Sequence, residues 1–172
     1  MIEEPSEAAA RRALMSAEIA ARTGIDEAMI GRPVHEFYAR VRADTLLGPV
    51  FEARISDWDI HLGRMCAFWS SVALMSGDYH GNPMGKHLPL PVDAAHFDRW
   101  LVLFEATAAE TCPPVAAAHF VERARRIAQS LELGIAISHG TPLRRGQRFR
   151  RDAVVAAAKE DSHERADRRT VP

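Results

Sequence analysis

The chain has 172 residues, with 22 Lys and Arg against 23 Asp and Glu and a formal net charge of −1. This length predicts one domain, long enough to bury a core without disulfide or metal crosslinks. The even charge balance argues against a nucleic-acid-binding protein that works through bulk positive charge, and two cysteines exclude a disulfide scaffold and suit a reducing compartment. The acidic N-terminus does not resemble a secretory signal, and no run of 18 apolar residues predicts a membrane span. We therefore expect a soluble, cytoplasmic protein.

Hydrophobic spacing predicts helices over residues 1–137, with no convincing strand. The first expected helix runs from Glu7 to Arg22 and ends near Gly24, and the second runs from a cap at Asp26 to about Val41. The third runs from a cap at Ser56 or Asp57 to about Met75. The last two run from a cap at Asp93 to about Thr111 and from Pro113-Pro114 to about Ile137. Pro33 interrupts the second pattern and is expected in a first turn or at a kink. Gly48-Pro49 is expected to break the chain, and residues 76–91 form a loop with at most a short turn around Met84–Leu88.

The composition changes near residue 138. Residues 138–172 contain nine Lys or Arg and five Asp or Glu, so this segment carries about +4 and residues 1–137 about −5. The segment offers one short apolar run, and we expect a flexible basic tail that contains at most one amphipathic helix, around 149–166. Such a tail is a solvated extension without a partner, a weak docking arm for an anionic partner, or a segment that caps the fold. Residues 1–24 are expected to form an N-terminal helical extension.

The eight histidines of the chain do not fall into common catalytic or metal-binding motifs. HExxH and CxxC patterns are absent, which argues against a dedicated zinc site. GxSxG, P-loop and GxGxxG patterns are absent as well, so a nucleophilic hydrolase, an NTPase or a dinucleotide-binding fold has no support.

Two histidines lie where a ligand could reach them. His61 shares a helix face with Met65 and Phe68, at spacings of four and seven residues, and is expected in the core, at its boundary or against a ligand. His87 lies in a Gly- and Pro-bounded loop, where it either faces solvent or ligates a cofactor.

Tyr38 and Trp100 bring polar groups to otherwise apolar helix faces, so each needs a hydrogen-bond partner, which is either a backbone carbonyl or a ligand. One loop histidine and several hydrogen-bonding groups around an apolar volume together suit a flat apolar cofactor with an axial iron site.

Four segments resemble the group III truncated hemoglobins. They are FYARVRADTLLGPVF (37–51), DWDIHLGRMCAFW (57–69), YHGNPMGKHLPLP (79–91) and HFDRWLVLFEATA (96–108). The resemblance is strongest over 37–108 and extends over about 25–137. It implies an all-α fold, a truncated globin in which two pairs of antiparallel helices form a two-over-two sandwich around one heme b (iron protoporphyrin IX).

The resemblance also implies roles for individual residues. His87 is similar to the proximal iron ligand, and Tyr38, His61 and Trp100 are similar to the groups on the gas-binding side. His61 either gates the pocket or coordinates iron in the absence of gas. The residues expected to contact the heme are Phe51, Arg64, Met65, Met84 and Phe97, where Arg64 is either a partner of a heme propionate or a solvated charge.

The expected function is binding of O2, NO and CO with tight hydrogen bonding to the gas. Tight binding suits O2, NO or peroxide chemistry, such as NO dioxygenase or peroxidase-like activity with an electron-donating reductase, better than bulk oxygen storage. The alternative is a gas sensor that signals through the basic tail without turnover. A helical diiron protein is a third class, but the ExxH spacing that it needs is absent.

Overall fold

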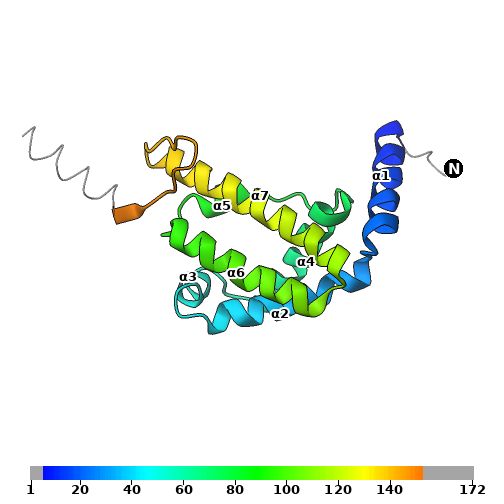
Figure 1. Ribbon diagram of the computed structural model, residues 1–172, viewed down its shortest axis with the longest axis horizontal. Helices are drawn as coiled ribbons and strands as arrows, with labels where there is room; N and C mark the ends of the chain where they lie inside the picture. Colours follow the sequence, from blue (N-terminus) through cyan, green and yellow to red (C-terminus); the bar gives the residue numbers. More distant parts are fainter. Residues whose placement is uncertain (1–5, 153–172) are drawn as a thin grey trace, which may run out of the picture.

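A computed structural model describes residues 6–152, and this part of the chain contains seven helices and no strand (Figure 1). Their bounds are α1 (Glu7–Thr23), α2 (Glu27–Ala43), α3 (Gly48–Glu52), α4 (Trp58–Leu74), α5 (Pro83–His87), α6 (Ala94–Thr111) and α7 (Pro114–Ser138). The all-α prediction is confirmed. Within the described residues, no helix is both long and apolar enough to cross a lipid bilayer.

The helices begin at the side chains that the sequence predicts as caps. Asp26 accepts a hydrogen bond from Met29 N at 2.7 Å, and Asp57 accepts one from Ile60 N at 2.9 Å. Asp93 forms a capping box with His96 at the start of α6. These carboxylates satisfy amide groups that have no partner inside the helix, which defines where α2, α4 and α6 begin.

Two local features add detail to the expectations. Of the two positions expected for Pro33, the first turn of a helix is wrong, since α2 begins at Glu27 and continues past Pro33 to Ala43. Gly48-Pro49 starts the short helix α3 instead of merely breaking the chain. Proline suits the first turn of a helix, because its missing amide hydrogen would have no partner there. A side chain at Gly48 would place its Cβ 2.8 Å from the Arg42 carbonyl oxygen, so the close approach of α3 to α2 requires glycine.

Four long helices form the body of the fold. α6 packs along α7, and α2 lies against both α4 and α6, with α3 beside the end of α2 (Figure 1). At the centre, the Trp69 ring stacks on Phe104, with centroids 4.6 Å apart, and meets Phe120 edge-on at 6.0 Å. These aromatic contacts join α4, α6 and α7 in one hydrophobic core.

The chain beyond α7 is packed where a flexible tail was expected from residue 138. Gly140, with φ of +69°, reverses the chain after α7, and Thr141 N donates to Ala136 O at 2.9 Å in a Schellman-type ending. The chain then returns along the fold, and the Phe149 side chain is 0% exposed. The prediction overlooked Phe149 as an apolar anchor, so the packed part of the chain extends at least to this residue. The amphipathic helix considered for 149–166 lies mostly outside the described residues.

Candidate functional site

His87 is the last residue of α5, a short helix held against α7. Asn82 caps α5 through a hydrogen bond from Gly85 N at 2.9 Å. The His87 Nδ1 atom lies 2.7 Å from the Pro83 carbonyl oxygen. A carbonyl oxygen can only accept, so Nδ1 carries the proton and Nε2 keeps a free lone pair. Burial lowers the pKa of His87, an effect that the bond to Pro83 partly offsets, and this favours the neutral imidazole that metal ions bind.

Met84 of α5 lies against a glycine of α7, Gly134. A Cβ built on Gly134 of α7 would lie 2.4 Å from Met84 Sδ and 2.6 Å from Met84 Cε. The absence of a side chain at this position therefore lets Met84 lie directly against the α7 backbone, three residues before His87 in α5. Met84 is half-buried and packs against the cluster formed by Phe97, Leu131 and Ile135.

A polar and aromatic cluster lies between α2 and α4. The Tyr38 ring meets His61 edge-on, with centroids 5.1 Å apart, and meets Phe51 at 5.9 Å. The pKa of the Tyr38 hydroxyl is raised, mainly by burial, so the group keeps its proton and remains a hydrogen-bond donor. The structure thus brings two predicted site residues, Phe51 of α3 and His61 of α4, into contact with a third, Tyr38 of α2.

His61 has a buried nitrogen without a partner. Within the described part of the chain, Nε2 of His61 is shielded from solvent and makes no hydrogen bond. Burial, followed by the positive charge of the exposed Arg64, lowers the pKa of His61 and favours its neutral form. Buried polar atoms normally find partners, so an unpaired Nε2 is the kind of feature found where a ligand or water completes the site.

Trp58, at the start of α4, belongs to the same cluster, and the sequence prediction overlooked it. Its ring lies 5.7 Å from His61 and 6.3 Å from Tyr38, and Arg42 stacks over it at 4.5 Å. Its Nε1 atom is the second buried nitrogen of this cluster without a partner among residues 6–152. Trp58 lies three residues before His61, which places both on one face of a helix, and this spacing is the signal that could have found it.

Trp100 reaches this region from α6 through Phe37. The Trp100 ring stacks on Phe104 at 5.3 Å with an interplanar angle of 9°, and it meets Phe37 edge-on at 5.3 Å. Phe37 in turn meets Tyr38 at 5.0 Å. Trp100 therefore lies one ring away from Tyr38, held in place by two phenylalanines.

The remaining predicted residues divide between the two hydrophobic clusters of the fold. Met65 is half-buried against the cluster that contains Tyr38, whereas Phe97 is buried in the cluster next to α5. Several large apolar side chains of these clusters are only half-buried even though they face other elements, and they are Val50, Phe51, Leu62, Met65, Phe68, Met84, Leu88, Leu90, Trp100 and Leu101. Because protein interiors are otherwise close-packed, such a set fits a site for a large apolar group.

The donor set favours a cofactor that brings most of its own metal ligands. In the described residues, no group of three or more His, Cys, Asp or Glu side chains could hold a metal ion. A single neutral imidazole at His87 is therefore insufficient for a bare metal ion, whereas it would suffice to hold heme, whose porphyrin would supply the other nitrogen ligands.

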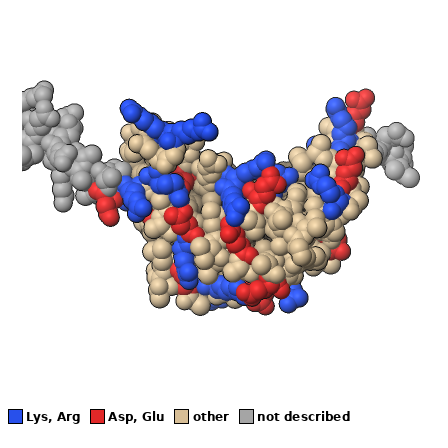
Figure 2. Space-filling view, viewed as in Figure 1, with Lys and Arg blue, Asp and Glu red and all other residues tan. Residues whose placement is uncertain are grey.

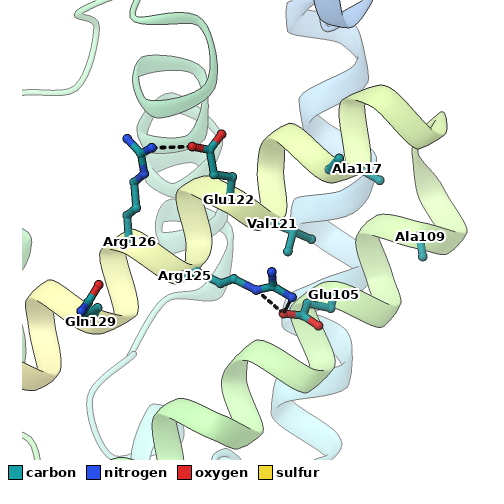
Figure 3. Close-up of a pocket in the computed structure, with 9 residues that line it drawn as sticks. Glu105, Ala109, Ala117, Val121, Glu122, Arg125, Arg126 and Gln129 are labelled. Atoms are coloured by element: carbon teal, nitrogen blue, oxygen red, sulfur yellow. Dashed lines mark hydrogen bonds and ion pairs between the residues drawn. The ribbon is translucent and has the colours of Figure 1, made fainter. Parts of the chain in front are cut away.

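A separate groove lies on the outer face of α6 and α7 (Figure 3). Its volume is about 500 Å³, and Ala109, Ala117 and Val121 contribute to its floor. An ion pair between Arg125 and Glu105 lies at its edge. The groove contains none of the predicted site residues, so it is distinct from the region around His87 and Tyr38.

Comparisons with known proteins place the chain in one family, although no protein-family model matches it. The chain is 38% identical over 86 residues to the group 3 truncated hemoglobin ctb of Campylobacter jejuni, and the match covers 47% of this chain and 68% of that protein. The crystal structure of the group III truncated hemoglobin from Campylobacter jejuni matches with a TM-score of 0.58 and 33% identity, over 62% of this chain and 88% of the other. The hemoglobin of the thermophilic phototrophic bacterium Chloroflexus aurantiacus matches with a TM-score of 0.55 and 26% identity, over 66% and 95% of the two chains. The chain therefore belongs to the group 3 truncated hemoglobins.

Proposed function

We propose that this chain binds heme b through His87 and holds a diatomic gas beside Tyr38, His61 and Trp100. The observation that carries the proposal is the 2.7 Å contact between His87 Nδ1 and the Pro83 carbonyl oxygen. This hydrogen bond orients the ring and leaves Nε2 free, as is common for histidines that bind metals. Heme, when bound, would supply an iron atom that His87 could hold and that could take up a diatomic gas.

The half-buried apolar side chains fit the walls that a porphyrin needs. Phe51 and Met65 would cover it from α3 and α4, and Met84 and Phe97 from α5 and α6. Arg64 is exposed at the edge of α4, where its guanidinium could pair with a carboxylate of the cofactor. Residues 25–137 thus provide the heme-binding unit, and the packed segment that follows α7 adds to it.

Donors on the gas side explain why tight binding is expected. The Tyr38 hydroxyl keeps its proton because burial raises its pKa, so it can donate to a gas molecule in the pocket. The Trp100 indole N–H is a second donor. Each such bond contributes about 1–3 kcal/mol when water is excluded. Two donors would therefore slow gas release by orders of magnitude, since about 1.4 kcal/mol corresponds to a factor of ten.

Slow release favours chemistry on the gas over its storage or transport. We include in the proposal the conversion of NO and O2, with one electron, to nitrate, and the reduction of peroxide to water with two electrons and two protons. Both reactions need an electron-donating partner protein. The donors at Tyr38 and Trp100 would stabilise the negative charge that develops on oxygen during these reactions.

His61 has two proposed roles, which spectroscopy distinguishes. Its neutral ring and unpaired Nε2 suit a gate that moves when gas enters, and they equally suit coordination of iron in the absence of gas. A six-coordinate low-spin ferric spectrum that becomes high-spin in His61→Leu would assign coordination to His61. A high-spin spectrum in the unsubstituted protein would assign the gate.

The first experiment is the visible spectrum of the purified full chain, reconstituted with hemin, reduced and then exposed to O2, NO or CO. We expect a Soret band and gas-dependent shifts. His87→Gly should lose heme or bind it weakly, and added imidazole should restore the reduced spectrum. Exposed His35 of α2 serves as the matched control, since His35→Gly should retain the spectrum. A colourless reconstituted chain, or an unchanged reduced spectrum in His87→Gly, would overturn the proposal.

A further inference from the structure

The segment after α7 makes a set of contacts that neither the family resemblance nor the proposed site explains. We call residues 143–151 the C-terminal strap. The strap turns at Gln147, whose N donates to Arg144 O at 2.9 Å. It then returns to the beginning of α6, where Phe149 O accepts from Ala94 N (Figure 1). Figure 2 shows basic side chains gathered at the end of the molecule where the strap lies, with acidic side chains beside them.

Arg148 and a buried glutamate fasten the strap to α7 and α6. Arg148 Nε lies 2.9 Å from both carboxylate oxygens of Glu132, and Arg148 Nη2 lies 2.8 Å from Asp98. The Phe149 amide N–H donates to the same Glu132 carboxylate at 2.8 Å. Glu132 is only 5% exposed, and these hydrogen bonds and ion pairs compensate for the removal of its carboxylate from water. The strap is thus part of the folded structure and not a loosely placed end.

The strap also forms hydrogen bonds with the backbone that follows His87. Ala94 N donates to Phe149 O at 2.8 Å, and Arg151 Nη1 donates to Leu90 O at 3.1 Å. The amide of Leu90 itself bonds to His87 O at 3.0 Å. Two successive hydrogen bonds therefore connect Arg151 of the strap, through Leu90, to the carbonyl of His87, and the bond at Ala94 adds a second attachment.

Side-chain packing reinforces this connection. Phe149 is 0% exposed and lies in one cluster with Val92 and Phe97, against which the half-buried Met84, Leu88 and Leu90 pack. Met84 and Leu88 lie close to His87 in the sequence, so Phe149 belongs to the buried cluster against which the segment that carries His87 packs. Removing the ring would leave a cavity that α5 and the loop after it could relax into.

We infer that the C-terminal strap positions His87. Phe149 and Arg148 are the positioning residues, and they determine how firmly the α5 segment holds His87 in the orientation that binds iron. The inference rests on the proposed function, because it takes His87 as the iron ligand. The strap touches the segment after His87 and not the ligand itself. It therefore acts on the orientation and mobility of His87 and leaves the gas-side residues Tyr38 and His61 in place.

The test compares four variants of the full chain reconstituted with heme. Phe149→Ala removes the anchor, and Phe149→Leu retains most of its volume. Phe120→Ala is the matched control, because Phe120 is equally buried on α7 but packs on Trp69, in the other cluster. Glu132→Gln keeps an acceptor for Phe149 N while it removes the charge that pairs with Arg148, and it provides a milder perturbation that leaves the core intact.

Three measurements separate positioning from general stability. The iron–histidine stretching frequency of the reduced protein reports on the His87 bond, the rate of heme transfer to an apoglobin acceptor reports on retention, and hydrogen exchange of the Ala94 amide reports on the strap contact. Phe149→Ala should shift the frequency, accelerate heme loss by about tenfold or more and speed exchange at Ala94. Phe149→Leu should largely restore all three, and Glu132→Gln should show smaller changes in the same direction.

Phe120→Ala should lower the unfolding temperature about as much as Phe149→Ala without shifting the frequency. Equal frequencies in the Phe149→Ala and wild-type proteins, or the same shift in Phe120→Ala, would overturn the positioning role. A wild-type chain that binds no heme would instead overturn the proposed function. In that case, exchange at Ala94 in the chain as purified still decides on the strap, and unchanged exchange in Phe149→Ala would refute its hold on residues 90–94.

Discussion

The rings of Tyr38 and His61 meet edge-on, with centroids 5.1 Å apart and planes at 89° to each other. This contact joins a donor on α2 to a neutral imidazole on α4, and both pKa shifts have burial as their largest cause. Burial keeps the Tyr38 hydroxyl protonated and His61 uncharged, so the pair offers donors and acceptors without a net charge. Such a pair can respond to a small polar ligand without the cost of burying an ion.

Removal of the Tyr38 hydroxyl tests its role as a donor. Tyr38→Phe keeps the aromatic ring and its contacts with Phe37 and Phe51, so the fold should be retained. The loss of one hydrogen bond worth about 1–3 kcal/mol should accelerate O2 release roughly ten- to a hundredfold. Stopped-flow measurement of O2 displacement by CO gives the rate directly. Thr111→Val is the control, because it removes a hydroxyl at the end of α6 that bonds to the Thr107 carbonyl oxygen, and it should leave the rate unchanged. An unchanged rate in Tyr38→Phe would remove Tyr38 from the set of donors.

The lowered pKa of His61 predicts how the heme-free chain responds to acid. The folded chain binds a proton at His61 less readily than the unfolded chain, so the free energy of unfolding falls as the pH drops through the ordinary histidine range near 6.5. His61→Leu should reduce this loss between about pH 7 and pH 5 in urea titrations. His35→Gln, at an exposed position of α2, is the control and should keep the wild-type slope. A His61→Leu slope equal to that of the wild type would contradict the prediction.

The helix caps could be predicted from the sequence, whereas the role of Trp58 could not. Caps at Asp26, Asp57 and Asp93 act within three residues, so local pattern alone predicts where their helices begin. Trp58 was missed because its importance depends on Tyr38, which lies twenty residues away on another helix. Spacing along one helix shows which residues share a face, but not which buried nitrogen is left without a partner.

Phe149 shows the same limit over a longer distance. The chain around it is rich in arginine, and composition alone indicates a solvated tail. Its burial depends on Glu132, which holds both Arg148 and the Phe149 amide from the previous helix. Glu132 of α7, Asp98 of α6 and the apolar cluster around Phe149 thus hold part of a basic segment against the fold, and no periodicity in the segment indicates this.

Gly134 offers a test of how closely α5 must approach α7. In Gly134→Ala the new methyl group would lie 2.4 Å from Met84 Sδ and 2.6 Å from Met84 Cε, so the flexible end of the Met84 side chain must move aside. We expect a smaller gain in the free energy of unfolding than in a helical Gly→Ala substitution without a close neighbour, because the displacement of Met84 offsets part of the helix propensity of alanine, together with faster heme loss. Gly31→Ala is the matched control, because Gly31 also lies inside a long helix, and no atom outside its own helix backbone and immediate neighbours lies within 4 Å of its added Cβ. That variant should gain roughly 0.5–1 kcal/mol from helix propensity alone. If Gly134→Ala were instead as stable as Gly31→Ala, with unchanged heme loss, the close approach of α5 to α7 would not constrain His87.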